Sequence, residues 1–79
     1  MELCAEIKKM LVKELSLDEE EVVSEAHLQD DLGADSLALL NLSTAISERY
    51  GIEMQGDDLV EIKNVGELVK LVESRISSK

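Results

Sequence analysis

The chain has 79 residues, with 18 acidic and 8 basic side chains, a formal charge of −10 and one aromatic residue. A chain of this length is expected to form one small domain, residues 1–79, around a core of aliphatic side chains. The negative charge argues against binding to nucleic acid or anionic membranes and favours protein partners with basic surfaces. One cysteine excludes an internal disulfide, and no apolar run approaches membrane-spanning length, so we expect a soluble cytoplasmic monomer.

The first predicted element is an amphipathic helix over roughly residues 2–15. Its apolar residues recur at intervals of three and four, which is the spacing of one helical face. They are Leu3, Ile7, Met10, Leu11 and Leu15.

A long acidic loop is predicted from residue 16 to residue 35, where the helical periodicity is lost. We expect Val22, Val23, Leu28 and Leu32 to pin this loop to the core. The loop contains no lysine or arginine. Loops of this length are uncommon in compact domains and usually carry function.

A second helix is predicted from Ser36 to Tyr50, and Gly51 then supplies a residue that readily takes a positive φ at the helix end. Its apolar residues cover nearly half of the circumference. The expected apolar face holds Leu37, Leu40, Ile46 and Tyr50, widened by Leu39, Leu42 and Ala45.

Two further helices complete the prediction, a short one within residues 57–62 and a last one over residues 65–77. Asn64 is the expected N-cap of the last helix, with Glu67 three positions on. Its apolar stripe is Val65, Leu68, Val69, Val72 and Ile76. The chain contains no proline or strand-like alternation, so the predicted fold is an all-α four-helix bundle of three long helices and one short. The loop length allows the first two helices to run parallel or antiparallel.

Ser36 lies where the acidic loop meets the second helix, in the stretch DLGADSL. A nucleophilic serine needs a general base and donors for an oxyanion. His27 is the only histidine, and it lies in the loop. Ala34 also breaks the likeness to the Gly-Asp-Ser-Leu box of a hydrolase family. We therefore do not expect an enzyme.

A metal site is also considered, because three aspartates lie close together. A calcium loop that began at Asp31 would need glycine at its sixth position and glutamate at its twelfth. Those positions hold Ser36 and Leu42, so no metal site is expected.

Two compatible readings of Ser36 remain, a helix N-cap and an attachment point. The start of a helix stabilises a phosphate by roughly 0.3–1 kcal/mol when it is exposed. Gly33 lets the chain turn without hindrance from a Cβ, and Leu32 and Leu37 can anchor the chain on either side of the hydroxyl. The residues alone leave both readings open.

The chain resembles acyl carrier proteins over its whole length. The resemblance rests on LGADSL at residues 32–37, the long acidic loop before it, the helix that closes at ERYGIEM, and the last helix from Val65. Its most specific element is the triplet Asp35-Ser36-Leu37.

The resemblance implies that a phosphopantetheinyl transferase attaches 4′-phosphopantetheine to the Ser36 hydroxyl. The arm would hold acyl groups as thioesters for synthases, transferases or ligases with basic surfaces. Asp35 would help to place the transferase, Leu37 would match the hydrophobic residue after the modified serine, and the core could open to shelter an acyl chain. The partner-recognition residues would be Asp31, Asp35, Leu37, Leu40, Glu48, Asp57 and Asp58.

Some positions depart from the family pattern. Typical fatty-acid carriers have acids at the second and fifth positions after the modified serine, where this chain has Ala38 and Asn41. These departures suggest a specialised lipid or polyketide-type pathway rather than general fatty-acid synthesis. The alternatives are an aminoacyl or peptidyl carrier, and an acidic helical interaction module in which Ser36 is only a helix cap.

Overall fold

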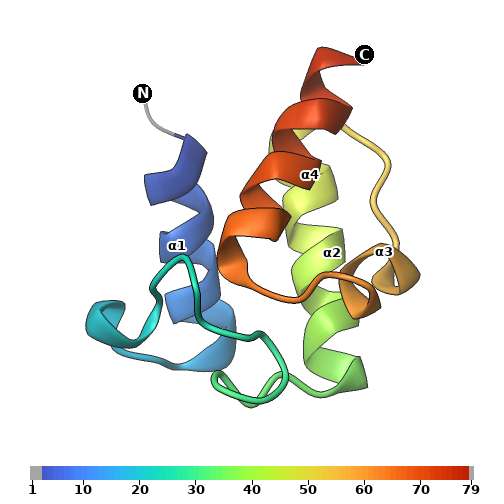
Figure 1. The fold of residues 1–79 in the computed structure, drawn as a ribbon. Helices are drawn as coiled ribbons and strands as arrows, with labels where there is room; N and C mark the ends of the chain where they lie inside the picture. Colours follow the sequence, from blue (N-terminus) through green and yellow to red (C-terminus); the bar gives the residue numbers. More distant parts are fainter. Residues whose placement is uncertain (1–2, 79) are drawn as a thin grey trace.

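The structure is a computed structural model that describes residues 3–78, and this part of the chain is helical with no strand (Figure 1). Its elements are α1 (Leu3–Leu15), a 3₁₀ turn η1 (Glu19–Glu21), α2 (Ser36–Tyr50), α3 (Gly56–Val60) and α4 (Val65–Ser77). The predicted all-α fold of three long helices and one short is confirmed. The main addition is η1, a short turn within the predicted loop.

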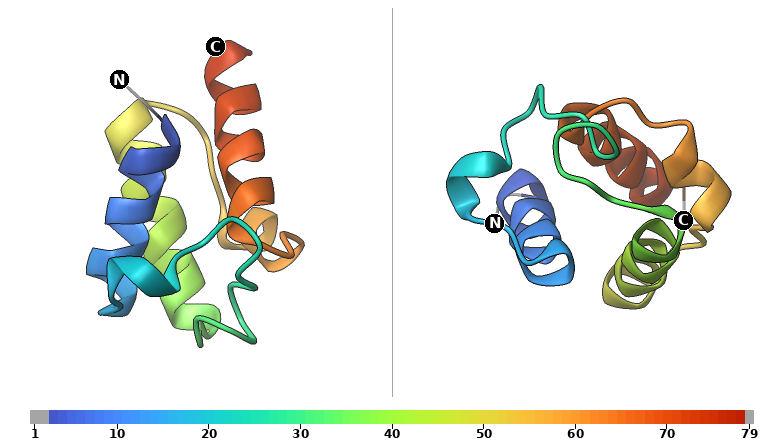
Figure 2. Two further views of the ribbon diagram at one scale, coloured as in Figure 1. Left: turned by 60° about the vertical axis from the view of Figure 1, so that its left-hand side comes forward. Right: turned by 90° about the horizontal axis from the view of Figure 1, so that it is seen from below.

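The three long helices pack side by side, with α1 antiparallel to both α2 and α4 (Figures 1 and 2). The loop after α1 crosses one end of the bundle to reach the start of α2, and α3 packs chiefly beside α2. The first two long helices therefore run antiparallel, a choice that the sequence left open. Within residues 3–78, no helix is both long and apolar enough to cross a lipid bilayer.

The core is aliphatic and draws on every long helix. The fully buried apolar side chains of the long helices are Ile7 and Leu11 of α1, Leu39, Leu42 and Ile46 of α2, and Val65, Leu68 and Val72 of α4. Burying a side chain of this size is worth about 1.5–3 kcal/mol relative to leaving it exposed. The core therefore supplies most of the free energy that holds the helices together.

The face that α2 turns to the core differs from the prediction. Leu37 is 66% exposed and Leu40 is 51% exposed, whereas Leu39, Leu42 and Ser43 are buried. The apolar residues of α2 surround so much of the helix that their spacing does not select one face. Packing against the other helices selects it, and two leucines remain on the surface near the start of α2.

The loop before α2 is attached to the core and to the start of α4. Val22, Leu28 and Leu32 are buried as predicted, but Val23 is 45% exposed, and Ala26, which the prediction omitted, is buried. The Ala26 carbonyl accepts a hydrogen bond from the Val65 amide at 3.1 Å, and the Ser24 carbonyl accepts one from the Gly66 amide at 3.0 Å.

These two bonds satisfy amides at the start of α4 that have no partner within the helix. The backbones approach so closely that a Cβ added to Gly66 would lie 3.4 Å from the Ser24 carbonyl oxygen. Loop and helix are therefore coupled through their backbones.

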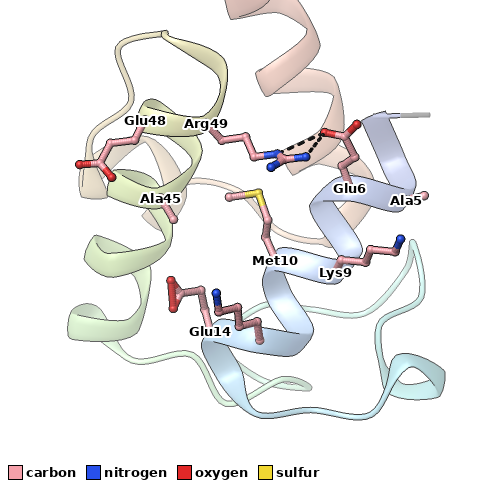
Figure 3. A pocket seen from close by; sticks show the side chains of 9 residues that line it. Ala5, Glu6, Lys9, Met10, Glu14, Ala45, Glu48 and Arg49 are labelled. Carbon is pink, nitrogen blue, oxygen red and sulfur yellow. Dashed lines mark hydrogen bonds and ion pairs between the residues drawn. The ribbon is translucent and has the colours of Figure 1, made fainter. Parts of the chain in front are cut away.

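A polar cluster joins α1 to the end of α2. The Glu6 carboxylate accepts a hydrogen bond from Arg49 Nη2 at 3.3 Å (Figure 3). It also accepts one from the Tyr50 hydroxyl at 2.9 Å. The hydrogen bond from Tyr50, aided by Arg49, holds the pKa of Glu6 below its ordinary value. An open groove beside this cluster separates α1 from α2, with Ala5, Met10 and Ala45 among its lining residues. None of its lining residues belongs to the start of α2.

We expect Glu6→Gln to lower the free energy of unfolding at neutral pH. We also expect the variant to lose less stability than wild type on acidification. A carboxyl group whose folded pKa is depressed contributes stability above its unfolded pKa, and that contribution is lost as the pH falls through the folded pKa. The difference in free energy of unfolding between wild type and variant should therefore narrow as the pH falls below about 4.5, the ordinary pKa of glutamate.

Urea unfolding at several pH values measures this gap. Glu48→Gln is the matched control, because the exposed Glu48 carboxylate has no partner among the described residues. An equal pH dependence for wild type and Glu6→Gln would contradict the stabilising role of the cluster.

Candidate functional site

The start of α2 is capped by Asp35 and not by Ser36. Asp35 has extended backbone angles, φ −92° and ψ −177°, and its Oδ1 accepts a hydrogen bond from the Ala38 amide at 2.8 Å. Ser36 is the first helical residue. An N-cap side chain must come from the non-helical residue that precedes the helix. The reading of Ser36 as a helix cap is therefore wrong.

The Ser36 side chain is exposed, and its hydroxyl forms no hydrogen bond to any other residue in the range 3–78. Asp35 satisfies the amide of Ala38, so those of Ser36 and Leu37 stay without an acceptor in the same part of the chain. Such amides give a helix start its partial positive charge. The position thus offers an accessible hydroxyl beside donors that favour a negatively charged substituent.

The segment of the loop that leads to Ser36 is packed against the core. Leu28, Leu32 and Ala34 are buried, and the Ala34 amide donates to the Leu28 carbonyl at 2.9 Å. Gly33 has a φ of +69°, in the left-handed region that favours glycine, although no atom lies within 4 Å of the position of a Cβ. Glycine is therefore favoured here by the backbone conformation, not by lack of space.

The predicted partner-recognition residues lie mainly on the surface. Leu37 and Leu40 expose their side chains, and Asp31, Asp35, Glu48 and Asp57 are also exposed. Their role in recognition stays a prediction.

Asp58 is instead half-buried and bound within the fold. It accepts hydrogen bonds from the Gln55 amide at 3.0 Å and from Arg75 Nη2 at 3.2 Å. The bond from Gln55, aided by Arg75, keeps the pKa of Asp58 below its ordinary value. Arg75 Nη1 also donates to the Glu53 carbonyl at 2.8 Å, so α4 holds the segment around α3. Sequence periodicity gave no signal for these long-range contacts.

His27 is placed in the loop with its ring turned to local partners. Its Nδ1 accepts a hydrogen bond from the Asp30 amide at 3.2 Å, and no hydrogen bond joins it to Ser36 among residues 3–78. In the same range, no group of three or more His, Cys, Asp and Glu side chains is arranged to hold a metal ion. Within the described range, the Ser36 hydroxyl is therefore exposed and not hydrogen-bonded to the histidine.

The geometry of this helix start agrees with the comparisons with known proteins. The family described as "Phosphopantetheine attachment site" matches residues 5–72. The "Acyl carrier protein" of Thermotoga maritima is 36% identical over 75 residues, which cover 95% of this chain and 93% of that protein. This chain belongs to the acyl carrier protein family. A second "Acyl carrier protein", from Petrotoga mobilis, is 37% identical over 76 residues, covering 96% of this chain and 89% of that protein.

Acyl carrier proteins are carriers and not enzymes, and the cofactor of the matched domain is phosphopantetheine. The residues at the start of α2 fit this group on structural grounds. A phosphodiester needs an accessible hydroxyl, and the Ser36 hydroxyl is exposed and free of protein hydrogen bonds within residues 3–78. Unpaired helix amides at the same place favour the negative charge of a phosphate.

Proposed function

We propose that this chain is an acyl carrier whose phosphopantetheine arm is attached to Ser36. The observation that carries the proposal is the exposed hydroxyl of Ser36 at the start of α2, with Asp35 rather than Ser36 serving as the cap. A serine that is not needed for capping can be esterified without breaking a helix contact. The position of Asp35 as the cap supports this proposal over the alternative of an interaction module in which Ser36 is only a helix cap.

Each neighbour of Ser36 has a distinct part in the proposal. Asp35 fixes the helix start and leaves its second carboxylate oxygen facing no partner in the described part of the chain, so this oxygen is available to a transferase. Leu37, with two thirds of its surface exposed, offers an apolar contact next to the attachment point. When bound, the arm supplies a thiol that carries acyl groups as thioesters.

We further propose a specialised pathway, in which a cytoplasmic, monomeric, single-domain carrier is recognised by partners with basic surfaces. Asn41 is exposed and Ala38 is half-buried, so both uncharged side chains lie on the part of α2 that follows Ser36. Charges at the rim of an interface mainly speed encounter between partners. A general fatty-acid enzyme with a basic surface should therefore meet this carrier more slowly than one that has acids at these positions.

Loading of the modified protein tests the function. The protein is first treated with coenzyme A and a phosphopantetheinyl transferase, and then with acyl-activating and aminoacyl-activating ligases. We expect intact mass to show an added acyl group that neutral hydroxylamine removes. Exclusive loading with amino acids would identify an aminoacyl carrier, and failure of all acyl loading on the modified protein would contradict the proposal.

A further inference from the structure

His27 forms a reciprocal cap on the turn that leads to Ser36. His27 Nδ1 accepts from the Asp30 amide at 3.2 Å, while the His27 amide donates to Asp31 Oδ2 at 2.7 Å. The His27 carbonyl also accepts from the Asp31 and Leu32 amides, at 2.9 and 3.0 Å. A capping box also satisfies two orphan amides with two side chains, ordinarily a hydroxyl and a carboxylate three positions on, whereas the carboxylate here belongs to Asp31, four positions on. Here an imidazole takes the place of the hydroxyl.

The capped turn connects the start of α4 with the start of α2, where Ser36 lies. On one side, His27 forms an isolated antiparallel bridge with Asn64, the N-cap of α4. On the other side, the turn ends at Gly33, and only two residues then separate it from Ser36. The position of the Ser36 hydroxyl relative to α4 therefore depends on the geometry of this turn.

The geometry points to His27 as a positioning residue for the attachment site, and we propose that it holds Ser36 in the place that a transferase recognises. The inference rests on the proposed attachment at Ser36. His27 acts through the loop and needs no contact with the hydroxyl. Its Nδ1 can accept the Asp30 amide only while that nitrogen carries no proton, because a protonated imidazole has two donors and no acceptor.

Protonation would break the cap without an equivalent replacement. The nearest carboxylate, Asp30 Oδ2, lies 3.7 Å from Nδ1 and its side chain is 83% exposed, so an ion pair there is weak. Asp31 is already bound to the His27 amide. Across the bridge, Asn64 is uncharged, and the Glu67 carboxylate accepts the Lys63 amide at 3.2 Å. Loss of the Nδ1 acceptor should therefore loosen the turn and disturb the presentation of Ser36.

Two substitutions of His27 distinguish the loss of the hydrogen-bond acceptor from the loss of the imidazole ring. His27→Ala removes the acceptor, whereas His27→Asn places a carbonyl oxygen near the same amide and does not ionise, since asparagine is a good capping residue. Gln29→Ala is the matched control, because Gln29 is exposed in the same turn and its side chain has no partner within residues 3–78.

The test measures kcat/KM of a phosphopantetheinyl transferase for each unmodified protein, together with amide hydrogen exchange at Asp30 and Leu32. At pH 8 we expect His27→Ala to lower kcat/KM by about fivefold, the effect of one neutral hydrogen bond, and to speed exchange at Asp30. His27→Asn and Gln29→Ala should stay within about twofold of wild type.

Equal kcat/KM and equal exchange for wild type and His27→Ala would overturn the inference, as would a His27→Asn variant that behaves like His27→Ala. Hydrogen exchange needs no modification of Ser36. If wild type were never modified, the proposed function would fail while exchange at Asp30 still decided whether His27 caps the turn.

Discussion

Replacing Ser36 with alanine should abolish the addition of phosphopantetheine while leaving the fold intact. The substitution removes the oxygen that would form the phosphodiester. It removes no protein hydrogen bond within residues 3–78, because Asp35 provides the cap and the Ser36 side chain is exposed. We expect the variant to keep its unmodified mass in a reaction with coenzyme A and transferase that converts wild type completely.

Ser24→Ala is the control for this experiment, since Ser24 is also an exposed serine in the acidic segment before α2. It should be modified as fast as wild type. Thermal unfolding should give Ser36→Ala a midpoint within a few degrees of wild type, because exposed substitutions usually change stability by less than about 0.5 kcal/mol. Modification of Ser36→Ala at the normal rate would show that another residue receives the arm.

The largest loss of stability among the changes considered should come from Leu42→Ala. Leu42 is fully buried in the middle of α2 and belongs to the same core cluster as buried residues of α1 and α4. Truncating a buried leucine to alanine typically costs about 2–5 kcal/mol, which includes the cavity left behind. Small domains have only about 5–15 kcal/mol of net stability, so this change should remove a large share of the free energy of unfolding.

Leu40→Ala makes the same chemical change two positions earlier, on the exposed side of α2. Half of the Leu40 surface is already in contact with solvent. Leu40→Ala should therefore lower the free energy of unfolding far less than Leu42→Ala does. Urea unfolding followed by circular dichroism measures both. Equal destabilisation by the two substitutions would contradict the face of α2 that the structure turns to the core.

The helix positions were predictable because their signals are local. Asn64 caps α4 as expected, with its side chain accepting from the Glu67 amide, and Gly51 ends α2 with a φ of 64°. The stripe on α1 around Ile7 and Leu11 also agrees with the structure. A capping residue or an amphipathic stripe acts within a few positions of the chain, so the sequence carries its information directly.

The errors concern choices that tertiary packing makes. The apolar residues of α2 lie on several sides of the helix, so spacing alone placed Leu40 in the core when it is half exposed. The prediction considered only Ser36 as the cap of this helix, although the Asp35 side chain can also accept a hydrogen bond. The backbone angles decide it, since Asp35 is extended and Ser36 is helical.

Long-range polar contacts were outside the reach of sequence patterns. Glu6 and Arg49 are 43 positions apart, and the bridge between His27 and Asn64 joins the loop to a distant helix start. Neither pair has a periodic or motif signal. Both appear only when the direction of each helix and the path of the loop are known, and the second of them led to the proposed role of His27.

The central claim is that the exposed hydroxyl at the start of α2 carries the arm, and locating the modification by mass spectrometry tests it most directly. The protein would be coexpressed with a phosphopantetheinyl transferase, digested, and its peptides fragmented by a method that preserves phosphodiesters. We predict a single phosphopantetheine on Ser36 and none on any other serine. An arm on another serine or on Thr44, or a chain that remains unmodified with several active transferases, would contradict the claim.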